Sequence, residues 1–186
     1  AKSTPSPTEV NVPASAESKS TVPTSTSTKT APSSTATTAA NCGGAGYAGT
    51  NTEFMGTETY LSTKKFRDAL AFAGLTTAAN AKQTVVFTMT DSVFDSLTPA
   101  QLAYMNQSPA AMKSVLGWHI VASCQTYASV FSSAKAPITI QTLNGPVTYT
   151  LDGHGKVNGA EIGIWDWFTS NGAVHYITSY IQPPQI

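Results

Sequence analysis

Residues 84–94 read TVVFTMTDSVF, and they carry the clearest structural signal in this sequence of 186 residues. The first six residues are short, apolar and rich in β-branched side chains, a pattern that predicts a buried strand over 84–89. The polar pair Asp91-Ser92 follows directly, and such side chains commonly cap helix N-termini. We therefore predict a strand that leads at once into a helix.

Helical patterns lie on both sides of this strand. Before it, residues 64–73 place four apolar side chains on one helical face, namely Phe66, Ala69, Leu70 and Ala73. Gly74 follows at a position where a helix commonly ends. After the strand, Thr-Pro at 98–99 and Ser-Pro at 108–109 each join a capping residue to a proline at the first helical position. The sequence thus predicts a helical first half.

The second half of the folded part predicts strands. Apolar and β-branched runs over 138–143 and 147–151 flank Asn144-Gly145, a strong signal for a tight hairpin turn. Further Asn-Gly and Asp-Gly turns separate these strands from two more, expected over 160–164 and 173–181. Helices followed by antiparallel strands indicate an α+β domain rather than alternating βαβ units.

The first forty residues differ in composition from the rest of the chain. They contain 24 Ser, Thr or Pro residues and no aromatic residue. Such a segment buries too little apolar surface to offset the entropy lost on ordering it. We predict a disordered Ser/Thr/Pro-rich stalk over residues 1–41 and a single folded domain over 42–186. This composition is typical of O-glycosylated spacers, and an unmodified flexible linker is the alternative.

The chain has two cysteines, Cys42 and Cys124. An even cysteine count in a chain with the composition of a secreted protein favours a disulfide, and two buried thiols are the alternative. A bridge between these residues would close a loop of about 80 residues, which the chain-entropy model values at about 4.5 kcal/mol. It would tie the start of the domain to its middle.

Charged residues make up 11% of the chain, with ten basic and ten acidic side chains. Nucleic-acid binding needs a clustered excess of Lys and Arg, so no nucleic-acid partner is expected. No apolar run approaches the roughly 20 residues of a membrane-spanning helix, so no transmembrane segment is expected either.

The sequence contains no recognisable catalytic or metal-binding motif. The three histidines, His119, His154 and His175, are too scattered for a metal site defined by spacing, and the common nucleophile and phosphate-binding motifs are missing. We therefore expect a protein that is not an enzyme and needs no cofactor. His119 closes an apolar helix face and His175 lies in a predicted strand, so both are expected to be hydrogen-bonded core residues.

Asn106-Gln107-Ser108 has the sequence of an N-glycosylation acceptor. Asn106 is therefore a possible glycosylation site in a secreted protein from a eukaryote. Pro109 directly after the acceptor sequence disfavours its use.

Three stretches resemble signature motifs of the fasciclin (FAS1) domain family. Residues 84–94 resemble its first signature, an apolar strand that ends in Ala-Pro-Thr-Asp and is followed by a Phe. Trp118-His119 resembles its central Tyr-His motif, and residues 171–177, NGAVHYI, resemble its second signature. The positions that match family signature residues are Phe87, Thr90, Asp91, Phe94, Trp118, His119, Asn171, Gly172 and His175. The order and spacing agree over about residues 54–184.

Two positions depart from the family pattern. Thr88-Met89 replaces the usual Ala-Pro, and Trp118 replaces the usual Tyr. The second change exchanges a hydroxyl for an indole N–H, which only donates hydrogen bonds. The resemblance therefore implies the family's fold but not its hydrogen bonds at position 118.

The resemblance implies a FAS1-like β-wedge or sandwich of antiparallel strands packed with several helices. It also implies a secreted, non-catalytic adhesion or recognition module at the cell surface, with a surface or extracellular-matrix protein or glycan as partner. The signature residues Asp91, His119 and His175 would then be mainly structural or shape the interaction surface.

The alternative function is that of a water-soluble carrier of an apolar small molecule. Some algal proteins that resemble this family bind carotenoids, so the fold can hold a carotenoid or another lipid. The apolar residues that could line such a site are Tyr60, Leu61, Phe66, Phe72, Trp165 and Trp167. Filling of the core is the competing interpretation for each of them. A carrier should expose an apolar groove, whereas an adhesion module should present a flatter and more polar face.

Overall fold

A strand and a helix form where residues 84–94 predict them. The computed structural model describes residues 42, 46–57, 61–126, 131, 137–152 and 154–182. Strand β1 spans Thr84–Met89, and all six of its residues are buried. Helix α4 spans Asp91–Asp95 and begins at the N-cap Thr90, whose hydroxyl oxygen accepts a hydrogen bond from the Val93 N–H. The cap is therefore Thr90 and not the predicted pair Asp91-Ser92.

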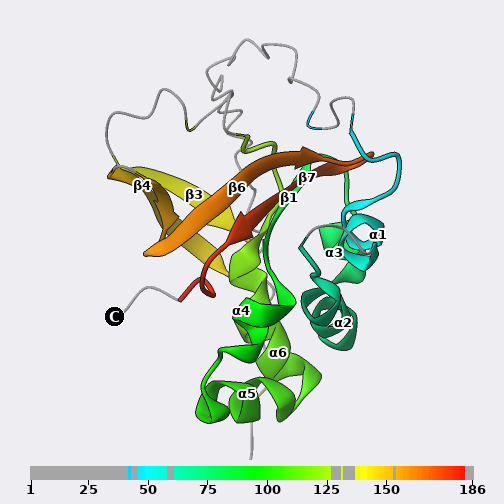
Figure 1. Ribbon diagram of the computed structural model, residues 1–186, viewed down its shortest axis with the longest axis vertical. Coiled ribbons are helices and arrows are strands. Elements are labelled where there is room, and N and C mark those ends of the chain that lie inside the picture. Colours follow the sequence, from blue (N-terminus) through cyan, green and yellow to red (C-terminus); the bar gives the residue numbers. More distant parts are fainter. Residues whose placement is uncertain are drawn as a thin grey trace, which may run out of the picture. The chain divides into compact units, whose positions relative to one another are not determined.

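Helices come before and after β1 in the described part of the chain. They are α1 (Asn51–Gly56), α2 (Lys64–Phe72), α3 (Thr76–Ala79), α4, α5 (Pro99–Asn106), α6 (Pro109–Leu116) and the 3₁₀ helix η1 (Gly117–His119). Figure 1 shows α1, α2 and α3 grouped on one side of β1, with α5 and α6 beside each other below α4. The remaining strands are β2 (Ile120–Val121), β3 (Ile138–Thr142), β4 (Gly145–Asp152), β5 (His154–Val157), β6 (Ala160–Phe168) and β7 (Gly172–Ile177).

The predicted helix ends are present. α2 ends with Gly74 in the left-handed region at φ +69°, where the Gly74 and Leu75 N–H groups donate to the Ala71 and Leu70 carbonyls. These two bonds form the Schellman motif. At the start of α5, Thr98 and Gln101 exchange the two hydrogen bonds of a capping box.

The strands of the described residues form one mixed sheet in the order β2-β1-β7-β6-β5-β4-β3. Neighbours are antiparallel except β1 and β7, which run parallel with Val86 opposite Val174. The prediction of antiparallel strands is wrong for this pair. Asn-Gly turns indicate the direction only of strands that follow one another, whereas the rest of the domain separates β1 from β7.

The two outer strands of the sheet come together. The Leu143 N–H, directly after β3, donates to the Ile120 carbonyl of β2 over 3.0 Å. The end of β3 therefore lies beside β2, and this bond satisfies one N–H and one carbonyl that an open edge would expose.

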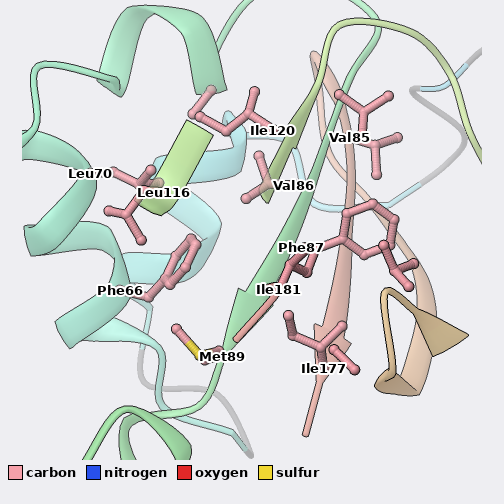
Figure 2. Close-up of a cluster of buried hydrophobic side chains, with 14 of the residues drawn as sticks. Phe66, Leu70, Val85, Val86, Phe87, Met89, Leu116, Ile120, Ile177 and Ile181 are labelled. Carbon is pink, nitrogen blue, oxygen red and sulfur yellow. The ribbon is translucent and has the colours of Figure 1, made fainter. Parts of the chain in front are cut away.

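The core lies on both sides of β1. In Figure 2, Val86 points toward Leu70 and Leu116 of the helices, while Val85 and Phe87 point to the opposite side, where Ile177 lies. All of these side chains are at most 2% exposed. β1 is therefore a central strand, covered on both faces, and this explains its continuous apolar sequence.

Cys42 and Cys124 form the predicted disulfide, with their Cα atoms 5.3 Å apart. Cys42 is buried in the main core. The bond ties the residues before α1 to those after β2. The predicted stalk over 1–41 lies outside the described residues.

Candidate functional site

Asp91 of the first signature connects two helices. Its Oδ1 accepts from the Lys65 N–H over 2.8 Å, and its Oδ2 accepts from the Ser62 hydroxyl over 2.7 Å. Lys65 lies in the first turn of α2, whose own N-cap residue, Thr63, makes no side-chain cap bond. Asp91 thus caps α2 from the start of α4.

His119 is buried and uses both ring nitrogens. Its Nδ1–H donates to the Phe87 carbonyl over 2.9 Å, and its Nε2 accepts from the Ile181 N–H over 3.1 Å. Because Nε2 is an acceptor, the ring is neutral in this arrangement. Burial lowers the pKa of His119 from 6.5 to about 4, although the hydrogen bond to Phe87 opposes that shift.

His175 is also buried, with the opposite tautomer. Its Nε2–H donates to the Gln125 carbonyl over 2.9 Å, and its Nδ1 accepts from the Asp166 N–H over 3.0 Å. Burial lowers the pKa of His175, while the hydrogen bond to Gln125 and the Asp166 carboxylate act in the other direction. Both signature histidines are hydrogen-bonded core residues in the structure.

Asn171 and Gly172 join the start of β7 to α1, to the end of α3 and to β1. The Asn171 side chain donates to the Ala79 and Ala81 carbonyls and accepts from the Asn51 N–H. Gly172 lies against β1 so closely that a Cβ atom there would be 1.7 Å from the Thr84 carbonyl oxygen. This position therefore requires glycine.

The other signature residues have packing roles. Phe87 is fully buried and Phe94 is partly buried against the core. The partly buried Trp118 ring lies over the hairpin turn, with Cη2 3.2 Å from a Cβ atom placed on Gly145. The signature residues thus build the domain and are not gathered at one surface.

An apolar groove lies along one side of α5, and we call it the Tyr104 groove. It has a volume of about 340 Å³ and is lined by Leu97, Ala100, Gln101, Tyr104, Met105, Val115 and Tyr180. The Gln101 side chain donates to the Tyr180 hydroxyl over 3.0 Å, and the Tyr104 and Ser114 hydroxyls are 3.1 Å apart. Polar atoms in the walls are therefore paired with one another, and the surface that they leave is apolar.

A second groove, the Phe72 groove, lies on the other side of α5 and has a volume of about 360 Å³. Its apolar lining comes from four helices: Phe72 of α2, Phe94 of α4, Leu102 of α5 and Met112 of α6. Acidic side chains at its rim are paired, Asp95 with Lys65 and Asp68 with Arg67. The groove therefore combines an apolar floor with an electrically balanced rim.

One exposed aromatic side chain stands at each groove. Phe72 is 47% exposed and Tyr104 is 48% exposed, values that are high for such large side chains. We call the surface formed by the two grooves and these side chains the helical face. The sequence singled out Phe72 and Asn106 of this face but missed the Tyr104 groove. Helical spacing identified neighbours along each helix, whereas the groove is made where α5, α6 and Tyr180 meet.

The residues suggested for an apolar ligand are not brought together. Phe66 fills the main core, Phe72 lines its groove, and Tyr60 lies outside the described residues. Trp165 packs in the main core, whereas Leu61 and Trp167 lie at a separate cluster around Phe54. The five of these residues that the structure describes do not form one continuous ligand site.

Asn106, the possible glycosylation site, is exposed at the end of α5 and contributes to the wall of the Phe72 groove. The Ser108 hydroxyl of the same acceptor sequence caps α6 by accepting from the Ala111 N–H. A glycan on Asn106 would therefore lie beside the groove.

A metal site and a membrane-spanning helix are absent from the described residues. No three His, Cys, Asp or Glu side chains gather there in a way that could hold a metal ion. Among the described helices, none has the length and apolar composition needed to cross a bilayer.

Comparison with known proteins agrees with this fold. The sequence pattern of the fasciclin domain matches residues 61–183, well over half of the chain, and the chain therefore belongs to the fasciclin domain family. A solved FAS1 domain pair from the insect cell adhesion molecule fasciclin I is similar in fold, with a TM-score of 0.52 and 16% sequence identity. The similarity covers 63% of this chain and 44% of that chain. No curated protein matches this sequence.

Members of the fasciclin domain family share several general properties. Fasciclin domains occur in extracellular proteins, usually lack cofactors and are in general non-enzymatic adhesion modules. A disulfide between Cys42 and Cys124 is consistent with an oxidising compartment.

Proposed function

We propose that this chain is a secreted, non-catalytic recognition module that attaches to a cell surface or extracellular matrix through its helical face. The observation that carries the proposal is the pair of apolar grooves on either side of α5, each with a half-exposed aromatic side chain. Aromatic anchors beside apolar pockets are typical of residues that dominate binding energy at protein interfaces.

The chemistry of the helical face indicates the kind of partner. Its rim charges are already paired, so attraction of an oppositely charged surface contributes little. Burial of apolar area would supply most of the affinity. We infer a surface or matrix protein that inserts apolar side chains, with an extracellular glycan as the alternative partner.

The test is retention of the purified full chain on intact cells and extracellular matrix of its own source. Replacing both Phe72 and Tyr104 with Ser should weaken retention about tenfold or more, because two aromatic anchors are lost. Leu151→Ser is the matched control, since Leu151 is 46% exposed but lies on β4. Equal retention of all three proteins would contradict the proposal, and so would equal weakening by the control.

A second candidate function is that of a carrier for an apolar small molecule such as a carotenoid or another lipid. The Tyr104 groove favours it, because its lining is almost entirely apolar. We would record absorption from 300 to 600 nm for the protein purified from its native source. A band that is extracted by organic solvent and lost in Tyr104→Ser would support a pigment carrier. A colourless protein would exclude the carotenoid version.

A further inference from the structure

Four aromatic rings follow one another from Tyr47, before α1, through Phe54 of α1 to Trp167 of β6 and Tyr176 of β7. Ring centroids are 5.5 Å apart for Tyr47 and Phe54, 5.4 Å for Phe54 and Trp167, and 6.5 Å for Trp167 and Tyr176. Phe54 and Tyr176 are buried, whereas Tyr47 is 37% and Trp167 is 43% exposed. We call these four residues the aromatic ladder, and its two exposed members flank the buried Phe54.

The backbone of β6 turns Trp167 outward. Asp166 has φ +55°, and the pairing of β6 with β7 shifts register between Ile164 and Trp167. As a result Trp165 packs inside against His175, with centroids 5.2 Å apart, while Trp167 joins the ladder on the other face. Bulges commonly re-aim a side chain near functional sites, and left-handed backbone at a non-glycine residue costs energy. A need for core filling alone does not explain an exposed Trp167.

An acidic side chain adjoins the ladder. A Cβ atom placed on Gly49 would lie 2.5 Å from Tyr47 Cε1 and 2.7 Å from Glu53 Oε2, so ring and carboxylate lie side by side over this glycine. The Thr50 N–H and hydroxyl donate to Glu53 Oε2, and these bonds lower the pKa of Glu53, which keeps it anionic.

The chain segments that supply the ladder contain no Lys or Arg, and Arg67 of α2, which approaches α1 at Gly56, is paired with Asp68. Residues 43–63 include Glu53 and Glu58 but neither Lys nor Arg. The chain after Lys156, which includes β6 and β7, likewise contains Glu161 and Asp166 but neither Lys nor Arg. Aromatic faces carry partial negative charge, so this surface is complementary to a positive group.

We propose that the aromatic ladder, together with Glu53, binds arginine or lysine side chains of a basic segment in a partner protein. The cation would lie on the exposed Trp167 and Tyr47 rings and approach the Glu53 carboxylate. Trp is the aromatic residue that holds cations best, and Arg is the cation found most often in such contacts. This surface is separate from the two grooves, and its binding does not depend on their occupancy.

The test uses the full chain labelled with ¹⁵N and the peptide acetyl-Gly-Arg-Gly-Arg-Gly-amide. The control peptide contains citrulline, the neutral analogue of arginine. NMR follows the indole N–H signals of Trp118, Trp165 and Trp167, and Trp167→Leu assigns the last of these. We expect the arginine peptide to shift the Trp167 signal saturably, with little effect from the citrulline peptide.

Variants at positions other than Trp167 keep its indole signal, so they measure how much each neighbouring residue contributes to peptide binding. Tyr47→Leu and Glu53→Gln should each weaken binding of the arginine peptide about fivefold. The Glu53→Gln variant keeps the capping box with Thr50, because Gln can also accept the Thr50 N–H bond. Tyr104→Leu, in the groove, should bind as the native chain does. The proposal is overturned if Trp167 does not respond, if citrulline binds equally well, or if Tyr104→Leu weakens binding as much as Glu53→Gln. If Tyr47→Leu fails to fold, the comparison of the arginine and citrulline peptides and the Glu53→Gln variant still test the proposal.

Discussion

Signature side chains of this domain bond to the backbone of elements far away in the sequence. Asp91 of α4 holds the first turn of α2, His119 of η1 links β1 to Ile181, and Asn171 holds the residues after α3. The two His119 bonds are buried, so their loss leaves backbone groups that water cannot easily satisfy, whereas the Asp91 and Asn171 bonds are exposed. The motif residues therefore act as cross-links between elements.

The two buried histidines make stability depend on pH. Well above pH 6.5 both histidines are unprotonated in the folded and the unfolded state. As the pH falls through 6.5 toward about 4, the unfolded state binds a proton that folded His119 does not. The free energy of unfolding should therefore fall as pH falls, by about 2 kcal/mol between pH 7.5 and 5 for His119 alone. His175 adds to the loss, because its pKa is also lowered.

Urea unfolding at pH 7.5, 6.5, 5.8 and 5.0 measures this dependence. We expect a plateau above pH 6.5 and a steady loss below it. Unchanged stability down to pH 5 would contradict the buried, neutral state of both histidines.

Asp91→Ala should lower the free energy of unfolding by about 1–2 kcal/mol, because α2 loses its N-terminal cap. The matched control is Asp95→Ala in the same helix. Within the described residues Asp95 forms only an exposed ion pair with Lys65, so its loss should cost less than about 1 kcal/mol. Urea unfolding at pH 7 compares the two variants, and an equal effect would show that Asp91 does not cap α2.

At the scale of elements, the parallel pairing of β1 with β7 is the contact that joins the two signatures. Gly172→Ala should cost more than about 3 kcal/mol, because the added Cβ meets the Thr84 backbone, which cannot yield without separating the strands. Gly163→Ala in β6 is the control, since its Cβ would have its nearest neighbour at 3.8 Å. It should change stability by less than about 1 kcal/mol. Thermal unfolding measures the melting temperature of both variants. Equal melting temperatures would contradict the close contact between Gly172 and the Thr84 backbone.

Local elements could be predicted from the sequence because their causes are local. The Thr98 capping box, the Gly74 helix end and the hairpin at Asn144-Gly145 each depend on residues only a few positions apart. The parallel β1–β7 pair and the bulge at Asp166 depend on contacts across the fold. Because of this bulge, Trp165 and Trp167 face opposite sides of the sheet, although strand alternation predicts one side.

At the scale of the whole molecule, the disulfide joins residues 82 positions apart. Replacing both Cys42 and Cys124 with Ser should lower the free energy of unfolding by about 4 kcal/mol, because the unfolded chain regains the entropy of an open loop. The native chain in strong reductant should then unfold at the same urea concentration as the double variant. Stability that neither treatment changes would contradict a contribution of the bond to the fold.

The candidate site could be predicted only in part from the sequence, because some of its residues meet only in the folded chain. Two of its residues could be identified in the sequence. Phe72 is an aromatic residue in a predicted helix, and Asn106 begins a glycosylation acceptor sequence. The Tyr104 groove exists because Tyr180, after the last strand, reaches α5. No spacing rule relates residues 104 and 180, so only the folded chain reveals the groove.

Site-specific photocrosslinking tests whether the helical face contacts a partner. A photoreactive phenylalanine analogue would replace Tyr104 in one sample and Leu151 in another, and each would be illuminated on the cells and matrix of the protein's source. We expect crosslinked product from position 104 and little from position 151, which is equally exposed but lies on β4. Crosslinking from position 151 alone, or no product from position 104, would contradict it.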